Sequence, residues 1–286
     1  MFSFLKNVNY WRLLLITRYG KLKKLEKCPN SDDDFIVSMT SYGDRLKTCH
    51  LAIRSLLRQS VLPNRIQLYI GKESRDISLS KQLLELQKYG LEIYRDVDDL
   101  KGHKKYFYCM NCNPRNRIIT VDDDCIYDKN TIHDLIVWGN KFPDAVIARR
   151  THRISVTNGS IEPYNAWDFE WCDSNPVPRK LLIAIGVGGV LYPRHFATDD
   201  LLNENEIVQN ALYCDDIWLK CYEIYKGIKV VSVPSKHPHP LQIKKTIGQG
   251  LKVRNLGSNG NDVSIIECMR HFNLNTDSFI GDSKTE

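Results

Sequence analysis

Three consecutive aspartates, Asp122, Asp123 and Asp124, directly follow an apolar run at residues 117–121. Like charges this close repel one another, so the triplet is costly unless something positive binds there. If the apolar run is a strand, a turn at its end can aim Asp122 and Asp124 the same way and leave Asp123 pointing aside. Two carboxylates on one side form an oxygen site for Mg²⁺ or Mn²⁺ that leaves room for substrate phosphates. The triplet therefore predicts a divalent metal site, and the plainer alternative is a solvated acidic turn.

A pair of histidines far along the chain could serve the same ion. His237 and His239 alternate within a Lys-His-Pro-His-Pro segment, where an extended chain would let both side chains point the same way. Either histidine could complete the shell of the metal or contact a phosphate. Two histidines with two aspartates would also suit zinc, but hard oxygen ligands favour Mg²⁺ or Mn²⁺.

A second acidic pair, Asp215 and Asp216, precedes a predicted helix at residues 217–225. One of the two could be a general base that deprotonates an acceptor hydroxyl. Acidic residues at the start of a helix also cap it and complement its dipole. The residue types and spacing leave both interpretations open.

Two lysines, Lys104 and Lys105, follow a mostly polar stretch at residues 98–103. Their ammonium groups could supply point charges to a diphosphate, or they could simply be solvated. The sequence contains no Walker-type phosphate loop, and the glycines within residues 186–189 lack the dinucleotide-binding spacing.

The elements that must position these residues alternate between strand and helix. Apolar runs predict strands, and segments with helical periodicity lie between most of them. This alternation predicts a mostly parallel sheet with helices on both faces, with the polar loops at the carboxyl ends of the strands, where such folds bind ligands. The predicted strands are 35–39, 66–70, 91–94, 117–121 and 145–148, and the predicted helices are 46–59, 79–89, 130–140 and 217–225.

The positive charge is confined to the N-terminus. The chain carries a net charge of +6, and its first thirty residues contain seven lysines and arginines against Glu26 alone, so the remainder is neutral. A nucleic-acid-binding domain would spread its basic residues over a folded face, so no nucleic-acid partner is expected. The overall composition, 42% hydrophobic and 26% charged residues, is that of a globular protein and excludes wholesale disorder.

The same N-terminal segment predicts an amphipathic helix. An apolar stripe flanked by lysines suits the headgroup region of an anionic membrane, whereas the alternative is a helix docked on the protein's own core. No apolar run is long enough to span a bilayer. The nine scattered cysteines, without a secretory signal, indicate a reducing compartment, so we expect a cytoplasmic protein at the inner face of the cytoplasmic membrane. The stripe consists of Phe4, Val8, Trp11, Leu15, Tyr19, Leu22 and Leu25.

Four blocks of sequence, taken in order, resemble a known family. They are residues 35–45 with 51–60, the Ile-Ile-Thr-Val-Asp-Asp-Asp run at 118–124, the glycine-rich stretch at 186–192, and Cys-Asp-Asp-Ile-Trp at 214–218. Together they resemble the bacterial family 2-like glycosyltransferases of the GT-A fold, in which the aspartate run is the DxD motif. The resemblance spans roughly residues 34–274.

The resemblance implies a transfer of a sugar from a nucleotide-diphosphate donor, expected to be a UDP-sugar, to a hydroxyl of a glycan or lipid-linked acceptor. Surface polysaccharide or glycolipid assembly, with inversion at the sugar carbon, is the implied setting. Asp122 and Asp124, with His237 or His239, would hold Mn²⁺ or Mg²⁺ on the diphosphate. Asp216 would be the base, with Asp215 as the alternative.

The resemblance also implies roles for other residues. The donor would be held by Thr40, Ser41, Tyr42, Arg45, Asp98, Asp99, Lys104, Lys105, Asp122 and Asp123, and the acceptor side would include Gly188, Gly189 and Trp218. The implied fold is GT-A-like, that is, Rossmann-like. We expect a basic segment and linker at 1–31, one catalytic domain at 32–275 with a donor half at 32–150 and an acceptor half at 151–275, and a tail at 276–286. The alternative functions are a sugar nucleotidyltransferase and a non-catalytic, membrane-peripheral carbohydrate-binding protein.

Overall fold

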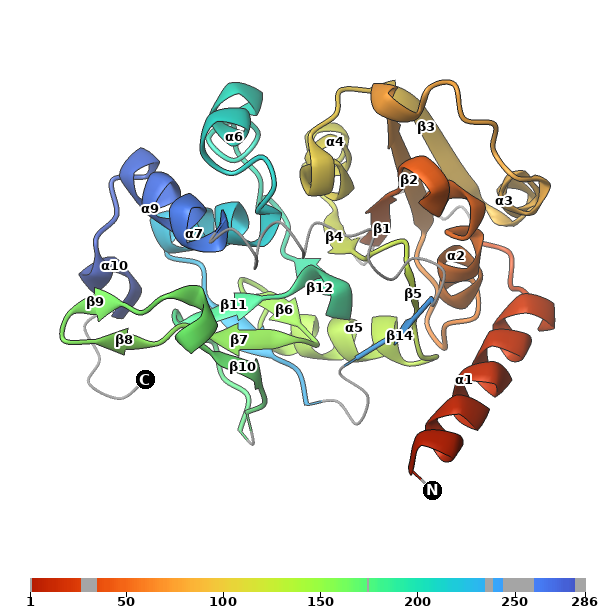
Figure 1. Ribbon diagram of the computed structural model, residues 1–286, viewed down its shortest axis with the longest axis horizontal. Helices are drawn as coiled ribbons and strands as arrows, with labels where there is room; N and C mark the ends of the chain where they lie inside the picture. The colour runs from red at the N-terminus through yellow and green to blue at the C-terminus, as the bar shows by residue number, and fades with distance from the viewer. Residues whose placement is uncertain (1, 27–34, 174, 235–238, 244–259, 281–286) are drawn as a thin grey trace.

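A computed structural model describes residues 2–26, 35–173, 175–234, 239–243 and 260–280, and its centre is a seven-stranded sheet (Figure 1). Six strands run parallel, and β12 runs antiparallel between β4 and β6. In spatial order the strands are β13 (Val230–Ser232), β6 (Val146–Ala148), β12 (Val190–Tyr192), β4 (Arg117–Thr120), β1 (Phe35–Thr40), β2 (Arg65–Gly71) and β3 (Leu91–Val97). The mostly parallel sheet predicted from the alternating pattern is confirmed.

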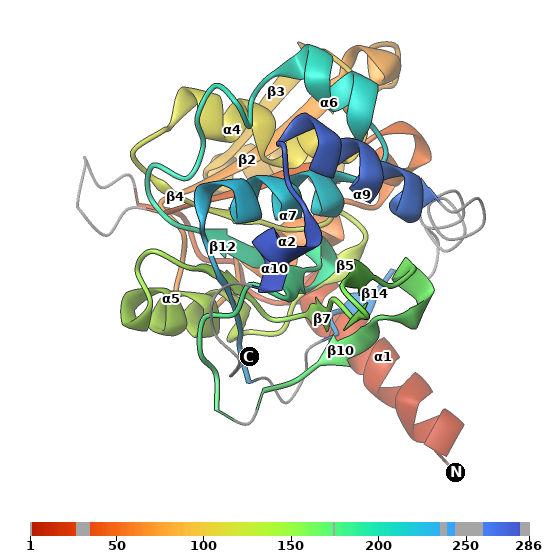
Figure 2. The same ribbon diagram turned by 90° about the vertical axis from the view of Figure 1, so that its left-hand side faces the viewer.

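Helices cover both faces of this sheet, because consecutive residues of a buried strand point to opposite sides. In β1, Val37 and Met39 face one hydrophobic core, and Ile36 faces the other. The first core is closed by α2 (His50–Leu56), α3 (Lys81–Glu85), the 3-10 helix η3 (Leu86–Tyr89) and α5 (Thr131–Lys141). The second is closed by α4 (Phe107–Cys112), α6 (Glu204–Asn210), α7 (Asp215–Lys226), α9 (Gly260–His271) and α10 (Thr276–Ile280). Figure 2 shows α7 and α9 side by side on this second face.

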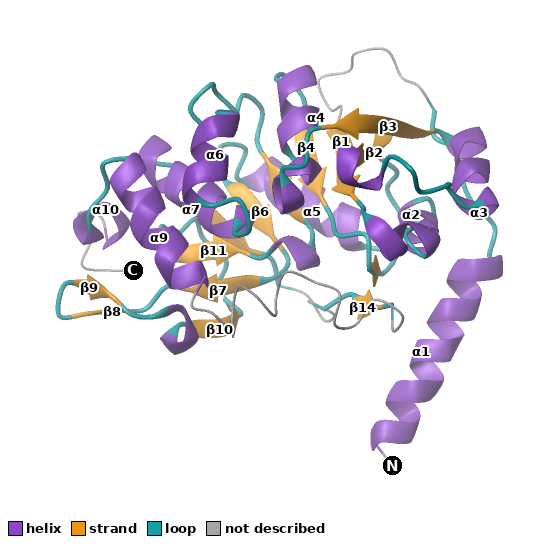
Figure 3. Ribbon diagram, turned by 45° about the horizontal axis from the view of Figure 1, so that its top comes forward, coloured by secondary structure: helices purple, strands orange, loops and turns teal. Residues whose placement is uncertain are grey.

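Smaller sheets lie beside the main one (Figure 3). An antiparallel sheet in the order β10, β7, β11 carries one wall of the cavity described below. Its strands are β10 (Asp168–Trp171), β7 (Thr151–Arg153) and β11 (Leu182–Ala184). Two short pairs join β14 (Leu241–Gln242) to β5 (Cys125–Ile126), and β8 (Val156–Thr157) to β9 (Ser160–Ile161).

Several boundaries differ from the predicted ones because the chain tightens into 3-10 turns. The helix expected over 46–59 is η1 (Gly43–Lys47) followed by α2. The helix expected over 79–89 is α3 followed by η3, which ends where Gly90 takes the left-handed conformation with φ of 105°. The glycine-interrupted stretch after residue 182 becomes β11, η6 (Gly186–Gly188) and β12. Further short turns are η2 (Lys72–Ser74), η4 (Lys101–Lys105) and η5 (Tyr164–Ala166).

The N-terminal helix α1 (Phe2–Tyr19) extends away from the body, as Figure 1 shows. The predicted apolar stripe extends too far along the chain, because the helix ends at Tyr19. Leu22 and Leu25 lie beyond this end and are buried in the core beside α2. The side chains of Phe4 and Val8 lie outside the described part of the chain. Within the described residues, no helix is both long and apolar enough to cross a membrane.

The C-terminal half of α1 has a buried side and an exposed side. Tyr10 and Thr17 are buried, and Arg54 of α2 donates from Nε to the carbonyl oxygen of Thr17 at 2.8 Å. Trp11, Leu15 and Tyr19 are exposed. The helix therefore docks on the body and also presents an apolar stripe to solvent.

The segment predicted as a C-terminal tail is partly folded. Residues 276–280 form α10, and its Phe279 is completely buried in the core shared with α7. The segment could not be recognised from its sequence, because a single aromatic side chain anchors it in the core and a single residue makes no repeating pattern.

Candidate functional site

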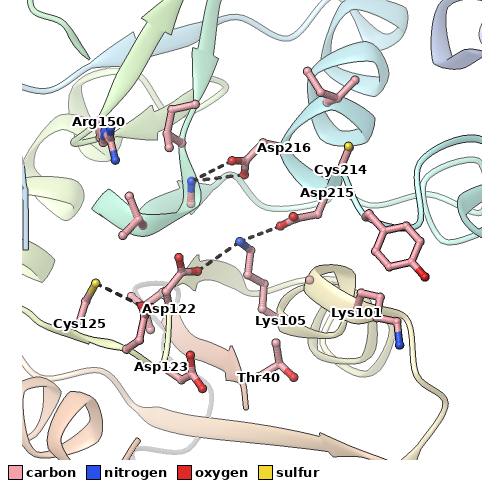
Figure 4. A pocket seen from close by; sticks show the side chains of 18 of the residues that line it. Thr40, Lys101, Lys105, Asp122, Asp123, Cys125, Arg150, Cys214, Asp215 and Asp216 are labelled. Carbon is pink, nitrogen blue, oxygen red and sulfur yellow. Dashed lines mark hydrogen bonds and ion pairs between the residues drawn. The ribbon is translucent and has the colours of Figure 1, made fainter. Parts of the chain in front are cut away.

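A large cavity of about 970 Å³ opens at the carboxyl ends of the central parallel strands. Thr40 is the last residue of β1, Asp99 follows β3 and Asp122 follows β4, whereas Asp216 comes from the first turn of α7. Segments from both halves of the sequence thus line the same cavity (Figure 4). This is the position at which open α/β sheets bind ligands.

The aspartate triplet lines this cavity, but its side chains are shared out differently from the prediction. Arg45 of η1 contacts Asp123 at 2.8 Å and Asp124 at 2.5 Å through the same Nη2 nitrogen. Asp122 instead faces Lys105, whose Nζ lies 3.4 Å from its Oδ1. The cause is topological: β1 and β4 are neighbours, so the loop after β1 brings Arg45 beside the turn after β4. The sequence predicted that Asp122 and Asp124 would point the same way. In the structure they have different partners, Lys105 for Asp122 and Arg45 for Asp124.

Burial governs the charge of the triplet. Burial raises the pKa of Asp123 to about 7, against the opposing effect of the Arg45 guanidinium. Burial also raises the pKa of Asp124, and the neighbouring Asp122 raises it further. A cation next to these carboxylates therefore stabilises their ionised form.

The donor set of the triplet fits a hard divalent ion that arrives with a substrate. All three aspartates line the cavity and offer only carboxylate oxygens. Among the described residues, no group of three or more His, Cys, Asp and Glu side chains is placed to hold an ion without help. Mg²⁺ is usually bound through one or two carboxylates together with substrate phosphates, so two protein ligands are sufficient.

The two predicted histidine ligands have different outcomes. His237 lies outside the described residues. His239 lines the cavity, and its Nε2 lies 3.0 Å from Glu170 Oε2 on β10. Its partner in this structure is thus a carboxylate of the small sheet.

The second acidic pair sits across the cavity and is linked to the triplet by Lys105. Lys105 Nζ lies 2.7 Å from Asp215 Oδ2, and its side chain is almost fully buried (Figure 4). Asp216 turns the other way and accepts a hydrogen bond from the backbone N–H of Gly186 at 3.3 Å. A Cβ at Gly186 would lie 2.4 Å from Lys105 Nζ, so a larger residue at this position would have to displace the Lys105 ammonium group.

These contacts separate the two adjacent carboxylates chemically. Burial opposes ionisation of Asp215, but Lys105 outweighs it and the pKa of Asp215 is lowered. Burial raises the pKa of Asp216 to about 7, and the negative charge of Asp215 adds to the rise. Two neighbouring acids whose environments push their pKa values apart are the arrangement that assigns acid and base roles in enzymes.

The two predicted diphosphate lysines are already paired. Lys104 is buried, and its Nζ contacts Asp99 at 2.6 Å and also Glu73, the carboxylate after β2. Buried ammonium groups require such partners, because removing them from water is expensive. Asp98, predicted beside Asp99, does not line the cavity and pairs with Lys72 near the surface.

The other predicted residues divide by whether they reach the cavity. Thr40, Tyr42, Arg45, Asp99, Lys104 and Lys105 line it, and Ser41 is buried behind the wall. The prediction that Gly188, Gly189 and Trp218 contact the acceptor has to be corrected, because none of them lines the cavity. Trp218 is completely buried, and its Nε1 donates to the carbonyl oxygen of Leu201 at 3.1 Å. A position next to an acidic pair therefore does not place a side chain beside the same ligand, since helical neighbours point in different directions.

The wall of the cavity that faces Asp216 contains residues that the motifs do not single out. They come from the small sheet and its neighbouring turn. A signal for them exists, because residues 164–171 contain four aromatic side chains among polar ones, which is unusual for a solvated connection. These residues are His152, Tyr164, Phe169 and Glu170, and Arg150 lines the same wall.

Comparisons with known proteins leave the family open. No family model matches the sequence, and no curated protein matches it. Among solved structures, the chain is similar to mannosyltransferase PcManGT from Pyrobaculum calidifontis in complex with GDP-Man and Mn²⁺, with 10% sequence identity and a TM-score of 0.48 over 94% of this chain and 77% of that chain. A likeness of this degree assigns neither a family nor an activity, so the function has to be inferred from the residues of the cavity.

Proposed function

We propose that this protein is a metal-dependent glycosyltransferase that moves a sugar from a nucleotide-diphosphate donor to a hydroxyl group of an acceptor. The observation that carries the proposal is the pairing of two acidic clusters across one cavity. Asp122 and its neighbours follow β4, Asp215 and Asp216 open α7, and Lys105 lies between them. One cluster has the chemistry to bind a metal diphosphate and the other has a candidate base. The four sequence blocks that resemble family 2-like glycosyltransferases support the same reaction.

The donor would lie over the carboxyl ends of β1 to β4. Thr40, Tyr42, Glu73 and Asp99 line that end of the cavity and offer hydroxyl and carboxylate groups for the hydroxyls and base of a nucleoside. Asp122 and Asp124 would hold Mn²⁺ or Mg²⁺, which neutralises the charge that develops on the departing diphosphate. A UDP-sugar is the donor that we expect from the sequence resemblance.

Asp216 would be the base. Its carboxylate takes the proton of the acceptor hydroxyl while that oxygen forms a bond to the anomeric carbon and the bond to the diphosphate oxygen breaks. A pKa of about 7 leaves Asp216 largely ionised slightly above neutral pH, yet basic enough to receive a proton. Lys105 keeps the adjacent Asp215 ionised. A single base and a direct displacement would invert the configuration of the sugar carbon.

The setting that we propose is the inner face of the cytoplasmic membrane, with a glycan or lipid-linked acceptor of surface polysaccharide or glycolipid assembly. The exposed stripe of Trp11, Leu15 and Tyr19 supports this proposal, and the exposed Arg18 and Lys21 beside it would favour an anionic surface.

Release of nucleoside diphosphate from a panel of sugar nucleotides with Mn²⁺ tests the reaction. The wild type should turn over one sugar nucleotide, and Asp122→Asn should reduce the rate at least about a hundredfold by removing a ligand of the ion. Asp44→Asn is the matched control, because Asp44 is exposed on η1 and pairs only with Lys47. Equal rates in the wild type and Asp122→Asn would contradict the proposal. Pyrophosphate release from a nucleoside triphosphate and a sugar 1-phosphate would instead identify a nucleotidyltransferase, and binding without turnover a non-catalytic protein.

A further inference from the structure

The wall of the cavity that belongs to the small sheet combines aromatic rings with charged groups. His152 on β7 meets the ring of Phe169 edge-on, with 4.6 Å between the centroids. Tyr164 of η5 lies 5.5 Å from Phe169 by the same measure, which completes an aromatic cluster. Phe169 is 45% exposed although it lines a cavity, so a large apolar ring face is available to a ligand.

A β-bulge puts two consecutive side chains on this wall. In a regular strand, neighbouring residues point to opposite faces. Between β7 and β10 the register shifts, so that Phe169 and Glu170 together oppose the single residue His152, and both of them line the cavity. Glu170 has φ of 59°, a left-handed conformation that is strained for residues other than glycine. Bulges of this kind re-aim side chains next to functional sites.

Hydrogen bonds hold the bulge in place. The backbone N–H of Glu170 donates to His152 Nδ1 at 3.0 Å. Burial lowers the pKa of His152 to about 4, so the ring is neutral at physiological pH. The same Nδ1 lies 3.0 Å from the carbonyl oxygen of Thr151, so it is in contact with two backbone groups.

The carboxylate of Glu170 is held from both sides. Arg150 Nη2 lies 3.2 Å from its Oε1, and His239 Nε2 lies 3.0 Å from its Oε2. All three side chains line the cavity, and Figure 4 labels Arg150 among the residues around the same space as Asp216. The Glu170 carboxylate offers hydrogen-bond acceptors, and the nitrogens of Arg150 and His239 beside it offer donors, all on the wall that carries the exposed ring of Phe169.

We propose that the bulged strand forms a subsite for one pyranose ring of the acceptor. A pyranose has an apolar face of C–H groups that packs on an aromatic ring, and a rim of hydroxyls that pairs with carboxylate and guanidinium groups. Phe169 packs against the C–H face, and Glu170 and Arg150 bind the hydroxyls. An acceptor with only a lipid chain at this point would remove water from Glu170 and Arg150 without replacing the hydrogen bonds that water makes to them. This inference rests on the proposed function, because it names the acceptor class of the same site.

The acceptor sugar, and not the donor sugar, is assigned to this wall because of its neighbours. Arg150 and Asp216 accept hydrogen bonds from two consecutive backbone groups: the N–H of Ile185 donates to the carbonyl oxygen of Arg150 at 3.0 Å, and the N–H of Gly186 donates to the Asp216 carboxylate at 3.3 Å. This wall is therefore joined directly to the proposed base, which must meet the acceptor hydroxyl.

Saturation-transfer NMR with the methyl glycosides of glucose, galactose, mannose and N-acetylglucosamine tests the subsite, in the presence of UDP or GDP with the diamagnetic ion Mg²⁺. We expect transfer to at least one glycoside in the wild type, loss of most of it in Phe169→Ala, and recovery in Phe169→Trp. Tyr225→Ala is the matched control, because Tyr225 is 46% exposed on α7 and does not line the cavity. Transfer that is equal in Phe169→Ala and the wild type, or absent in the wild type, would overturn the proposal.

A second measurement separates this inference from the proposed function and from the donor. Thermal unfolding with UDP or GDP and Mn²⁺ reports the donor side, because a ligand that binds the folded state raises its apparent stability. If the nucleotide raises the melting temperature but no glycoside shows saturation transfer, only the acceptor subsite is contradicted. If neither effect is seen, the proposed function is contradicted as well. If Phe169→Ala raises the KM for the sugar nucleotide and not that for the glycoside, the sugar ring that packs on Phe169 belongs to the donor, and the acceptor assignment is wrong.

Discussion

Lys105 Nζ lies 2.7 Å from the Asp215 carboxylate, and the ammonium group is nearly excluded from solvent. The same nitrogen lies 3.4 Å from Asp122, so one buried cation joins the turn after β4 to the start of α7. The distance between the two acidic clusters depends on this link. Lys105 is therefore a positioning residue between the proposed metal site and the proposed base.

Lys105→Met should lower the free energy of unfolding by about 3–5 kcal/mol, because it leaves Asp215 buried without its cation. Urea unfolding near neutral pH measures the loss. The double variant Lys105→Met with Asp215→Asn is the control, and it should recover most of the stability, since the buried charge of Asp215 is removed together with its cation. If the double variant is no more stable than Lys105→Met, the pair is not the cause of the loss.

The pH dependence of that loss has a definite sign. Lys105 lowers the folded-state pKa of Asp215, so the pair contributes stability that is complete above the unfolded pKa of about 4 and lost as the pH falls through the lower folded value. The deficit of Lys105→Met should therefore be largest near neutral pH and shrink towards acid.

The rate of sugar transfer should rise with pH through about 7 and level off above it, because Asp216 works in its ionised form and its pKa is about 7. Initial rates across this range measure the profile. Asp216→Asn should reduce the rate by roughly a hundredfold to ten-thousandfold, the usual contribution of a general base. A retained profile in Asp216→Asn would assign the titration to another group.

The same substitution should stabilise the fold. The unfolded-state pKa of an aspartate is near 4, so keeping Asp216 ionised in the folded state costs stability as the pH rises from there towards 7. Asp216→Asn removes that cost, and its melting temperature should exceed that of the wild type above neutral pH. A lower melting temperature would indicate a mainly structural role.

Arg45→Met should destabilise the protein by about 3 kcal/mol or more, because Arg45 is the cation beside the buried Asp123 and Asp124. If Asp122 and Asp124 bind a divalent ion, Mn²⁺ should raise the melting temperature of this variant more than that of the wild type. Choline chloride at equal ionic strength is the control for screening. Equal Mn²⁺ shifts in both proteins would contradict the metal assignment.

Glu170→Gly should be more stable than Glu170→Ala by about 1 kcal/mol, because both variants lose the carboxylate and only glycine adopts the left-handed conformation without strain. The two proteins form a matched pair for chemical denaturation. Both should bind acceptor glycosides more weakly than the wild type. Equal stability of the two variants would show that the bulge relaxes when the carboxylate is removed.

Replacing Trp11 and Leu15 by serine should weaken binding to anionic phospholipid vesicles by at least about tenfold, because both side chains would leave the headgroup region. Co-sedimentation at low and high salt measures the effect. Serine at Val263 and Ile266 of α9, each 56% exposed, is the control for exposed apolar residues elsewhere. Unchanged sedimentation of the Trp11 and Leu15 variant would sink the membrane proposal.

The sheet could be predicted from sequence because its strands are short apolar runs between turn residues, as at residues 35–40 and 65–71. The acidic clusters could be located because adjacent aspartates are conspicuous, one cluster after a buried strand and the other at the start of a helix. The partners of these charges could not be predicted, since Arg45, Lys104 and Lys105 choose carboxylates that only the three-dimensional fold brings near. Phe169 and Glu170 were equally hidden, because a bulge breaks the alternation on which strand patterns depend.

The antiparallel strand β12 has a consequence for how the chain is made. It fills the gap between β4 and β6, which are separated from it by the whole small sheet in sequence. A nascent chain that has not yet reached Tyr192 exposes two unpaired strand edges in the middle of its sheet, where intermolecular pairing can start. Folding on the ribosome must therefore wait until most of the protein has emerged, and contacts of such long sequence separation form slowly. The site that joins both halves of the sequence is assembled later still, because α7, which carries Asp215 and Asp216, follows β12 in the chain.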